Sequence, residues 1–566
     1  MRVLLVGLLI CVTTACGGPR SPQYHQKLVV LGIDGLDPDL VGRFMHEGKL
    51  PNMHKLVLRG MLRRLETTPS PDASAWASFA TGMNPGKHGI FGNESKALPI
   101  GTAFWNVAGT AGVRSSVLMV PTTFPPEPLK NGELLAGSPT PDLRRTRGTF
   151  YYFSSDMRKD DEGLNTVDGG IRHAIVFDGN LASSHVEGPD NLSLPLTVFW
   201  NRIGRSATVE IDGNSIRLDE GEWSKWIDID FRANPFSHQH GLIEFCLVHA
   251  TSSLALYASP IQWNPSRPPA TLSWPAGFAA DVFERVGPYR TLGWSEATSA
   301  LDAGLIDERL FLDDAQRAFD DRTQIILQRL ETNTWDLLVG QVDTLDHIQH
   351  VMWRLMDPSH PGYDRAAAAR FGETIEQMYR RADAFVGAVA AHLAPDTPLV
   401  VMSGYGSRGV TRTFDLRRWL VLEGMIGRAT VTATGGITLT PAGRANEDHL
   451  VARLTAELDP ATKSPIVAAV YRRETVYSGP QTANAPDLQL ALAPGYHLGT
   501  ATSVLTPNRS KWSADHVSLD YKSVPGVLLS TRPSTTENPR VVDIAPTVLQ
   551  HFGVPIPKEI DGIPLF

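Results

Sequence analysis

Cysteine is scarce in this chain, which has three among 566 residues. Cys11 and Cys16 lie in an N-terminal segment that we expect to be processed, so Cys246 has no partner for a disulfide within the mature chain. Stability must therefore come from apolar burial, and 566 residues with 42% apolar content are enough for a large core. We interpret Cys246, in the run LIEFCLV, as a buried strand residue rather than a nucleophile.

Long runs of basic residues are also missing. Lys and Arg number 52 against 60 Asp and Glu, which gives a formal net charge of -8. This balance provides no electrostatic footprint for a polyanion, so we expect no nucleic-acid partner. The glycine-rich loop that binds dinucleotides and the Gly-Lys-Ser/Thr loop that holds nucleotide phosphates are absent as well.

The N-terminus has the pattern of an export signal. Met1 and Arg2 precede an apolar run over residues 3–12, which is too short to cross a bilayer as a helix. The next residues, TACG at 14–17, place small side chains before Cys16, as in bacterial lipoprotein signals. We therefore predict a lipoprotein-type signal peptide over residues 1–16, a lipid anchor on Cys16 and export to the bacterial periplasm or cell envelope. A plain secretory cleavage nearby is the alternative.

The rest of the chain predicts an α/β fold. Apolar runs of strand length occur at residues 28–33, 116–120, 337–342 and 399–402, and a helical period covers residues 374–393. Strands buried on both faces that alternate with helices predict a core with a mostly parallel sheet flanked by helices. Ligands of such sheets bind beyond the carboxyl ends of the strands, and Asp34 lies at one of these ends.

Residues 180–275 have a different pattern, with alternating polar and apolar residues separated by DG and EG turns. We predict an inserted, antiparallel β-rich subdomain there, within an α/β core formed by residues 27–179 and 276–566. Trp200, Trp223 and Trp226 would suit a carbohydrate-binding face if they formed a row, but packing is the simpler interpretation.

A group of acidic and imidazole side chains points to metal chemistry. Asp346 and His350 are four residues apart, so on a helix they lie on one face and can hold a single ion. Asp34 and His516 are further candidates from distant segments. Taken alone, Asp346 also fits a helix cap and His350 a satisfied helix histidine.

Five ordered segments carry a family resemblance: LGIDGLDPDLV, WASFATGMNPGKHGIFGN, DHIQHVMWRLMDPSHPGYD, DHVSLDYKSVPGVLLS and VVDIAPTVLQHFGVPIP. They resemble the alkaline phosphatase superfamily and are most similar to its type I phosphodiesterase/nucleotide pyrophosphatase-like phosphohydrolases. The resemblance implies an alkaline phosphatase-like core and two zinc-like ions. It assigns Asp346, His350 and His516 to the first ion and Asp34 to the second. The Asp-His pair that completes the second site in that family falls on Gly404 and Tyr405, which cannot replace it.

The family's hydroxyl nucleophile falls on Asp72, for which three interpretations are open: a metal ligand, a carboxylate nucleophile or a cap for a helix that starts near Ala73. A shift in register would instead restore Ser70 or Ser74. Asn93 matches the asparagine that contacts a phosphoryl oxygen in the nucleotide pyrophosphatase branch, and it also fits a simple turn.

The sequence therefore predicts an exported, metal-dependent phosphohydrolase of low activity, with one Zn²⁺ ion expected and a second doubtful. Its expected partners are a phosphate-ester small molecule and, through Cys16, a membrane. The alternative is a catalytically inactive pseudoenzyme that binds a ligand or a protein partner. The substrate and the oligomeric state stay open.

Overall fold

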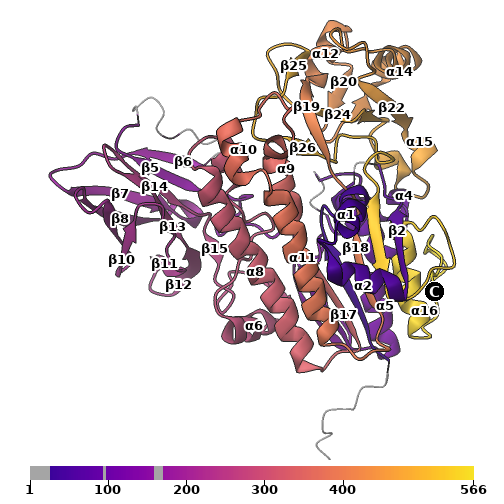
Figure 1. Ribbon diagram of the computed structural model, residues 1–566, viewed down its shortest axis with the longest axis horizontal. Helices are drawn as coiled ribbons and strands as arrows, with labels where there is room; N and C mark the ends of the chain where they lie inside the picture. The colour runs from indigo at the N-terminus through magenta and orange to yellow at the C-terminus, as the bar shows by residue number, and fades with distance from the viewer. Residues whose placement is uncertain (1–25, 70, 94–96, 158–162, 164–169) are drawn as a thin grey trace, which may run out of the picture.

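The structure is a computed structural model that describes residues 26–69, 71–93, 97–157, 163 and 170–566 (Figure 1). The predicted signal peptide, Cys16 and Ser70 lie outside these residues. Among the helices in the described ranges, none is both long and apolar enough to pass through a membrane.

An eight-stranded sheet forms the centre of the molecule. Its order is β16 (Ser273–Trp274), β4 (Gly132–Leu135), β3 (Ser115–Leu118), β17 (Leu337–Val342), β1 (Leu28–Ile33), β18 (Leu399–Ser403), β27 (Gly526–Ser530) and β2 (Met61–Leu65). The five strands from β4 to β18 are parallel, whereas β16 and β27 run antiparallel to their neighbours. The predicted α/β core with a mostly parallel sheet is confirmed.

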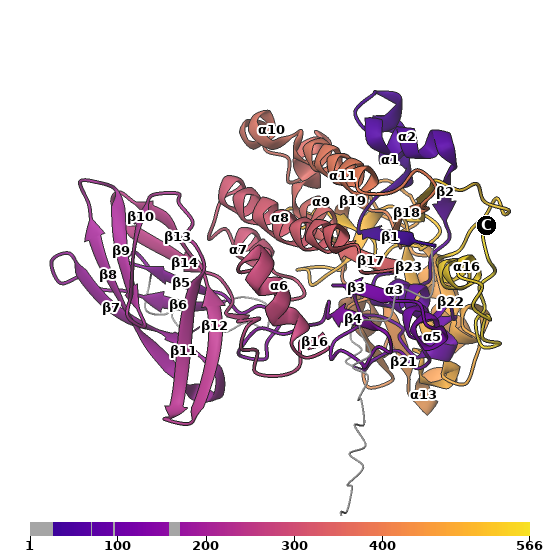
Figure 2. The same ribbon diagram turned by 90° about the horizontal axis from the view of Figure 1, so that it is seen from below.

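Helices cover both faces of this sheet, as Figure 2 shows. One face packs against α8 (Glu308–Thr332), α9 (Thr344–Met356) and α11 (Thr374–Ala391), together with α1 (Pro38–His46) and α2 (Pro51–Arg59). The other face packs against α3 (Ala73–Thr81), α5 (Phe104–Ala111) and α16 (Ile544–His551). Alternate residues of β1 supply the two cores: Val29, Leu31 and Ile33 face the first group of helices, and Leu28 and Val30 face the second.

The β-rich region lies at one end of the molecule, beyond α6 (Phe278–Val286) and α8 (Figure 2). One of its sheets contains β7 (Leu181–Glu187), β8 (Ser193–Asn201), β9 (Ser206–Ile211) and β10 (Asn214–Asp219). A second contains β11 (Ile227–Asn234), β12 (Ser237–Ile243) and β15 (Gln262–Trp263), and a third contains β5 (Tyr151–Ser154), β6 (Ile171–Ala174), β13 (Phe245–Ala250) and β14 (Leu254–Ala258).

The limits of this region differ from residues 180–275. β5 and β6 precede residue 180 and join the region because β5 pairs with β14, about a hundred residues later. β16 precedes residue 275 but belongs to the central sheet. Trp200 is buried and donates its indole N–H to the carbonyl of Ala250, so it does not form part of an exposed aromatic row.

A smaller lobe follows β18 and has its own apolar core. It contains a sheet of β20 (Ala429–Val431), β21 (Gly436–Leu439), β22 (Val467–Arg472) and β23 (Leu488–Leu492), with helices α12 (Leu416–Leu422) and α14 (Glu447–Thr455) (Figure 1). Strand β19 (Arg408–Phe414) pairs with β24 (Gly495–Leu498), β25 (Leu505–Pro507) and β26 (Ala514–Asp515). β26 places the next residue, His516, against α9 through a hydrogen bond from Ser513 N to the His350 carbonyl. The remaining helices are α4 (Pro85–His88), α7 (Thr298–Asp302), α10 (Arg365–Phe371), α13 (Pro441–Arg444) and α15 (Arg473–Val476).

Candidate metal centre and cleft

Asp346, His350 and His516 come together at the carboxyl end of the central sheet. β17 ends at Val342, and α9 places Asp346 and His350 one turn apart. Nε2 of His350 lies 3.3 Å from one oxygen of Asp346, and Nδ1 of His516 lies 3.5 Å from the other. The ligand atoms of all three lie within 4.8 Å of one another, and each residue is at least 96% buried.

The hydrogen bonds of this group fit a bound cation. His350 donates Nδ1–H to the Ala514 carbonyl at 2.7 Å, so Nε2, which faces Asp346, is the ring nitrogen available to a metal ion. Both ring nitrogens of His516 are buried and have no hydrogen-bond partner, an arrangement that is unfavourable without a ligand. Burial alone would raise the pKa of Asp346, but the charges of His350 and His516 hold that pKa below its ordinary value.

Asp34 lies nearby but is engaged differently. The indole N–H of Trp76 and the side-chain amide of Gln341 donate to its carboxylate at 3.0 and 2.8 Å. Burial, followed by the charges of Asp346 and Asp72, raises the pKa of Asp34 well above its ordinary value. Sequence reasoning missed both donors, although Gln341 is a polar residue in an otherwise apolar strand.

Tyr405 fills the space beside these carboxylates. Its ring stacks on the His516 imidazole, with centroids 4.0 Å apart and planes at 13°. Its hydroxyl lies 3.4 Å from Asp72 Oδ1 and is also within hydrogen-bonding range of Asp34. Burial and the charges of Asp34 and Asp72 raise the pKa of the phenol well above its ordinary value, so the hydroxyl is neutral. At Gly404, an added Cβ would meet only the Ala75 side chain, at 3.2 Å.

Asp72 precedes α3, but its side chain does not cap that helix, so the cap interpretation is wrong. The carboxylate instead accepts from the Asn93 amide and the Tyr405 hydroxyl. Asn93 takes the capping role, because its oxygen accepts from Ala73 N at 3.2 Å. The backbone at Asp72, with φ 149° and ψ -109°, is strained for a residue with a side chain.

The hydroxyl of Ser74 does not face this group. It shares a 2.7 Å hydrogen bond with Thr68 and also donates to the Pro69 carbonyl at 3.3 Å. Ser74 therefore does not take the nucleophile's place. The described residues leave Asp72 as the side chain at that position.

A second buried network lies next to the group. Nδ1 of His347 lies 2.8 Å from Glu296, and its ring stacks on Trp294 at 3.8 Å. Burial opposes protonation of His347, but Glu296 and Asp343 raise its pKa to about 9. Asp343 forms a 3.0 Å ion pair with Arg322. His347 is thus a fixed positive charge beside the cleft, and its partner Glu296 had no signal in the sequence.

Part of this group lines a cleft of about 490 Å³, whereas His350 and His516 lie behind Asp346 and are not in its lining. Asp34, Asp72, Asn93, Asp346 and Tyr405 line one part of it, and the lining also includes Arg145, Arg147, Asp343, His347 and Trp294. The lining of the cleft therefore combines carboxylates, the His347 imidazole and the guanidinium groups of Arg145 and Arg147.

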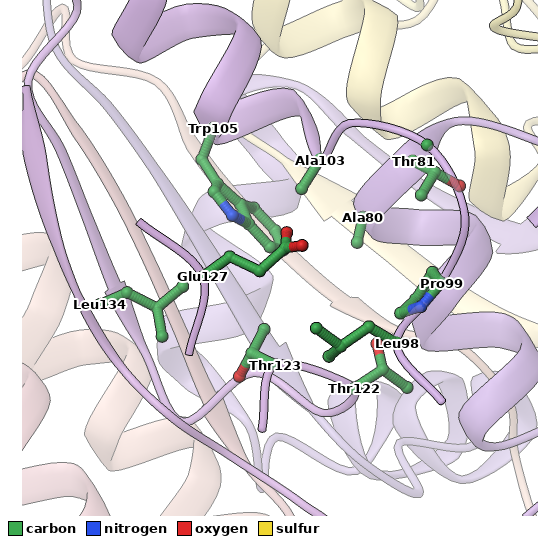
Figure 3. Close-up of a pocket in the computed structure, with 11 residues that line it drawn as sticks. Ala80, Thr81, Leu98, Pro99, Ala103, Trp105, Thr122, Thr123, Glu127 and Leu134 are labelled. Atoms are coloured by element: carbon green, nitrogen blue, oxygen red, sulfur yellow. The ribbon is translucent and has the colours of Figure 1, made fainter. Parts of the chain in front are cut away.

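Figure 3 shows a smaller neighbouring pocket, which shares Leu98 and Thr122 with the cleft. Glu127 is the one acidic side chain in its lining. The pocket contains no imidazole, so the larger cleft is the candidate site.

The amino-acid sequence matches the family described as type I phosphodiesterase / nucleotide pyrophosphatase over residues 28–190 and 253–512. The chain belongs to this family. The resemblance found in the sequence motifs is thereby confirmed. The matched residues include Asp34, Asp72, Asp346 and Tyr405. His516 lies just past the matched residues. The unmatched residues 191–252 fall within the β-rich region.

Solved structures of other phosphodiesterase-family and hydrolase proteins are similar to the chain. Murine ectonucleotide pyrophosphatase/phosphodiesterase 5, in an inactive form in complex with AMP, is 12% identical, with 94% of this chain and 96% of that chain covered and a TM-score of 0.44. Phosphonoacetate hydrolase from Sinorhizobium meliloti 1021 in complex with phosphonoformate is 13% identical, with 94% and 95% covered and a TM-score of 0.47. No curated protein matches the chain.

Proposed function

We propose that this family member is a metal-dependent phosphate-ester hydrolase of low activity, with one Zn²⁺ ion held by Asp346, His350 and His516. The observation that carries the proposal is the buried His516 imidazole, which has no hydrogen-bond partner and faces an acidic group. Two imidazoles and a carboxylate are the ligand set of a zinc site that keeps a position open for substrate.

The side chains around the group support phosphate-ester chemistry. The chemistry that zinc supplies at such a site is Lewis acidity toward a phosphoryl oxygen and toward water. Asn93 presents an amide N–H at the Asp72 carboxylate, where it can donate to a phosphoryl oxygen instead. Arg145 and Arg147 on the cleft wall attract an anionic substrate. Water takes the place of the hydroxyl nucleophile, since Asp72 stands at that position.

Tyr405 is the reason for expecting low activity. Its phenol ring stacks on His516 and its hydroxyl contacts Asp72, at a position where the family resemblance implies a ligand of the second ion. A neutral phenol is a poor ligand for zinc. A one-ion centre lacks the second half of the clamp on the attacking and leaving oxygens, so turnover falls.

The same tyrosine favours the second candidate, a pseudoenzyme that binds a phosphate ester or a protein partner without turnover. In that case the hydrogen bonds of Tyr405 and Asn93 occupy the Asp72 carboxylate, so that it takes no part in a reaction, and the cleft acts as a binding site.

One experiment separates the two functions. Zinc per chain is counted after equilibration with Zn²⁺, and hydrolysis of a chromogenic phosphodiester is assayed for the wild type, His350→Ala and the exposed control His392→Ala. The hydrolase hypothesis predicts that His350→Ala removes one zinc per chain relative to the wild type and abolishes a slow turnover, and that His392→Ala does neither. Turnover seen only in the triple variant Asp72→Ser, Gly404→Asp, Tyr405→His supports the pseudoenzyme. A His350→Ala protein with unchanged zinc content and turnover refutes the proposed centre.

We also propose that the protein is exported and anchored in the cell envelope through a lipid on Cys16. The support is the apolar segment and the small residues before Cys16. Cell fractionation tests it: the wild type is expected with the membranes, and Cys16→Ser is expected to leave them. Equal distribution of the two proteins contradicts the anchor.

A further inference from the structure

A second group of two imidazoles and one carboxylate lies in the β-rich region, outside the cleft. His173, His185 and Glu187 each offer a ligand atom, and these atoms lie within 4.8 Å of one another. None of the three lines the cleft. The proposed hydrolase does not use them.

Two edge strands from different sheets bring the three residues together. His185 and Glu187 are two residues apart on β7, so their side chains point to the same face. β7 is the last strand of one four-stranded sheet, and β6, which carries His173, is the last strand of another. Figure 2 shows β6 and β7 in the same lobe at the end of the molecule. The group therefore sits where the edges of two sheets meet.

The geometry places both imidazoles on one carboxylate. Nε2 of His173 lies 3.1 Å from one Glu187 oxygen, and Nε2 of His185 lies 3.5 Å from the other. The side chains of His173, Glu187 and His185 are 8%, 28% and 51% exposed, so one end of the group is buried and the other opens to solvent.

Neighbouring residues hold the group in position. The His173 ring stacks on Phe153 with centroids 4.9 Å apart and planes at 9°. The Tyr151 hydroxyl donates to the main-chain carbonyl of Glu187. The buried His173 ring and the main chain of Glu187 are thus held in place before any ion binds.

We propose that His173, His185 and Glu187 bind a Zn²⁺ ion that joins the edges of the two sheets. Two imidazole nitrogens and a carboxylate oxygen are a ligand set that zinc prefers, and the fourth position faces solvent beside His185. The ion would tie β6 to β7, the end strands of two different sheets. This is a structural role, separate from hydrolysis.

A similar group on β11 and β12 lacks this potential. Asp230, His238 and His240 also lie within 4.8 Å of one another. However, Nε of Arg232 lies 2.7 Å from the Asp230 carboxylate, which therefore already has a cation. Among the described residues, the ion-pair partners of Glu187 are the two histidines alone. The group of Asp230, His238 and His240 thus provides a matched control for zinc binding within the same β-rich region.

The test uses the full chain in a His350→Ala background, so that zinc at the proposed hydrolytic centre does not contribute. Each protein is equilibrated with Zn²⁺, freed of excess metal and titrated against a chromophoric chelator. We expect one zinc per chain in the background variant, and an affinity at least about 100-fold weaker when His185→Ala is added. Adding His238→Ala is expected to leave both values unchanged. His185 is half exposed, so its removal is compatible with folding.

Thermal unfolding provides the second measurement. Zn²⁺ is expected to raise the unfolding midpoint of the background variant and to have no such effect after His185→Ala or Glu187→Gln, because only an ion held by the folded site stabilises it. The proposal is overturned when the background variant holds no zinc against the chelator. Equal zinc affinity with and without His185 overturns it as well. Zinc content that is unchanged by His350→Ala but falls on His185→Ala would instead contradict the hydrolytic centre, so the two failures are distinguishable.

Discussion

A buried ion network joins the β-rich region to the α/β core, and its removal gives the sharpest test of the packing described above. Arg290 lies 2.8 Å from Asp314 and 2.6 Å from Asp321, both on α8, and 3.2 Å from Glu244, between β12 and β13. Arg317 also pairs with Glu244 and Asp314. The side chain of Arg290 is 3% exposed, so water cannot replace these partners.

Replacement by Arg290→Met keeps an unbranched apolar side chain and removes the guanidinium group with its charge. The buried carboxylates of Glu244 and Asp314 and the partly buried carboxylate of Asp321 are then left with Arg317 as their one cation within the network. Breaking a buried ion network in this way costs about 3–5 kcal/mol, because uncompensated charge stays in the interior. Removing Glu244 as well, with Glu244→Met, should recover part of the loss, since the two substitutions affect the same contacts.

The assay is urea unfolding followed by tryptophan fluorescence, with the midpoint and the slope compared between variants. The control is Arg285→Met, because Arg285 forms an exposed pair with Asp281 on α6 that contributes little. Arg290→Met is expected to lower the midpoint strongly and the control to leave it nearly unchanged. A midpoint for Arg290→Met equal to that of the control would refute the view that this network holds the two parts together.

Two further predictions concern stability. Burial lowers the pKa of His88 to about 3, so the unfolded chain takes up a proton near pH 6.5 that the folded protein does not. The free energy of unfolding should therefore fall as pH decreases from about 6.5 toward 3, by up to about 1.4 kcal/mol per pH unit. Urea unfolding of His88→Asn should show a shallower dependence of this free energy on pH. The same pH dependence in the variant and the wild type would contradict a lowered pKa for His88. At Gly32, an added Cβ would lie 2.3 Å from the Trp76 ring, so Gly32→Ala should destabilise by about 1–3 kcal/mol. The control is Gly42→Ala on α1, where the added Cβ meets no atom within 4 Å and should stabilise the protein by about 0.5–1 kcal/mol. Equal melting temperatures for the two variants would show that the Trp76 ring moves aside without cost.

The central strands and helices were predictable because their signals are local. The apolar runs at residues 28–33 and 337–342 coincide with β1 and β17, both buried on each face of the sheet. The helical period at residues 374–393 corresponds to α11, which ends two residues earlier. In each case the burial pattern repeats within one element, so a single segment contains the information.

The pairing of β5 with β14 and the partners of the site residues were not predictable in this way. Trp76 and Gln341 lie 42 and 307 residues from Asp34, and the two donors meet it only after the sheet has formed. Glu296 reaches His347 across 51 residues. No periodicity relates such positions, because their contact depends on the packing of whole elements against one another.

Asp72, Gly404 and Tyr405, the three positions where this chain departs from the family pattern, depend on one another. Asp34, Asp72 and Asp346 are buried close together, and burial together with their mutual repulsion raises the pKa values of Asp34 and Asp72. Without a second cation, Tyr405 supplies one neutral donor within reach of Asp72 and Asp34, and Gly404 adds no further charge. Gly404→Asp alone would therefore place a fourth carboxylate beside the group while the phenol still stood at the position of a metal ligand. Restoration of two-ion chemistry consequently requires Tyr405 and Asp72 to change together with Gly404, and each single substitution should lower stability without raising turnover.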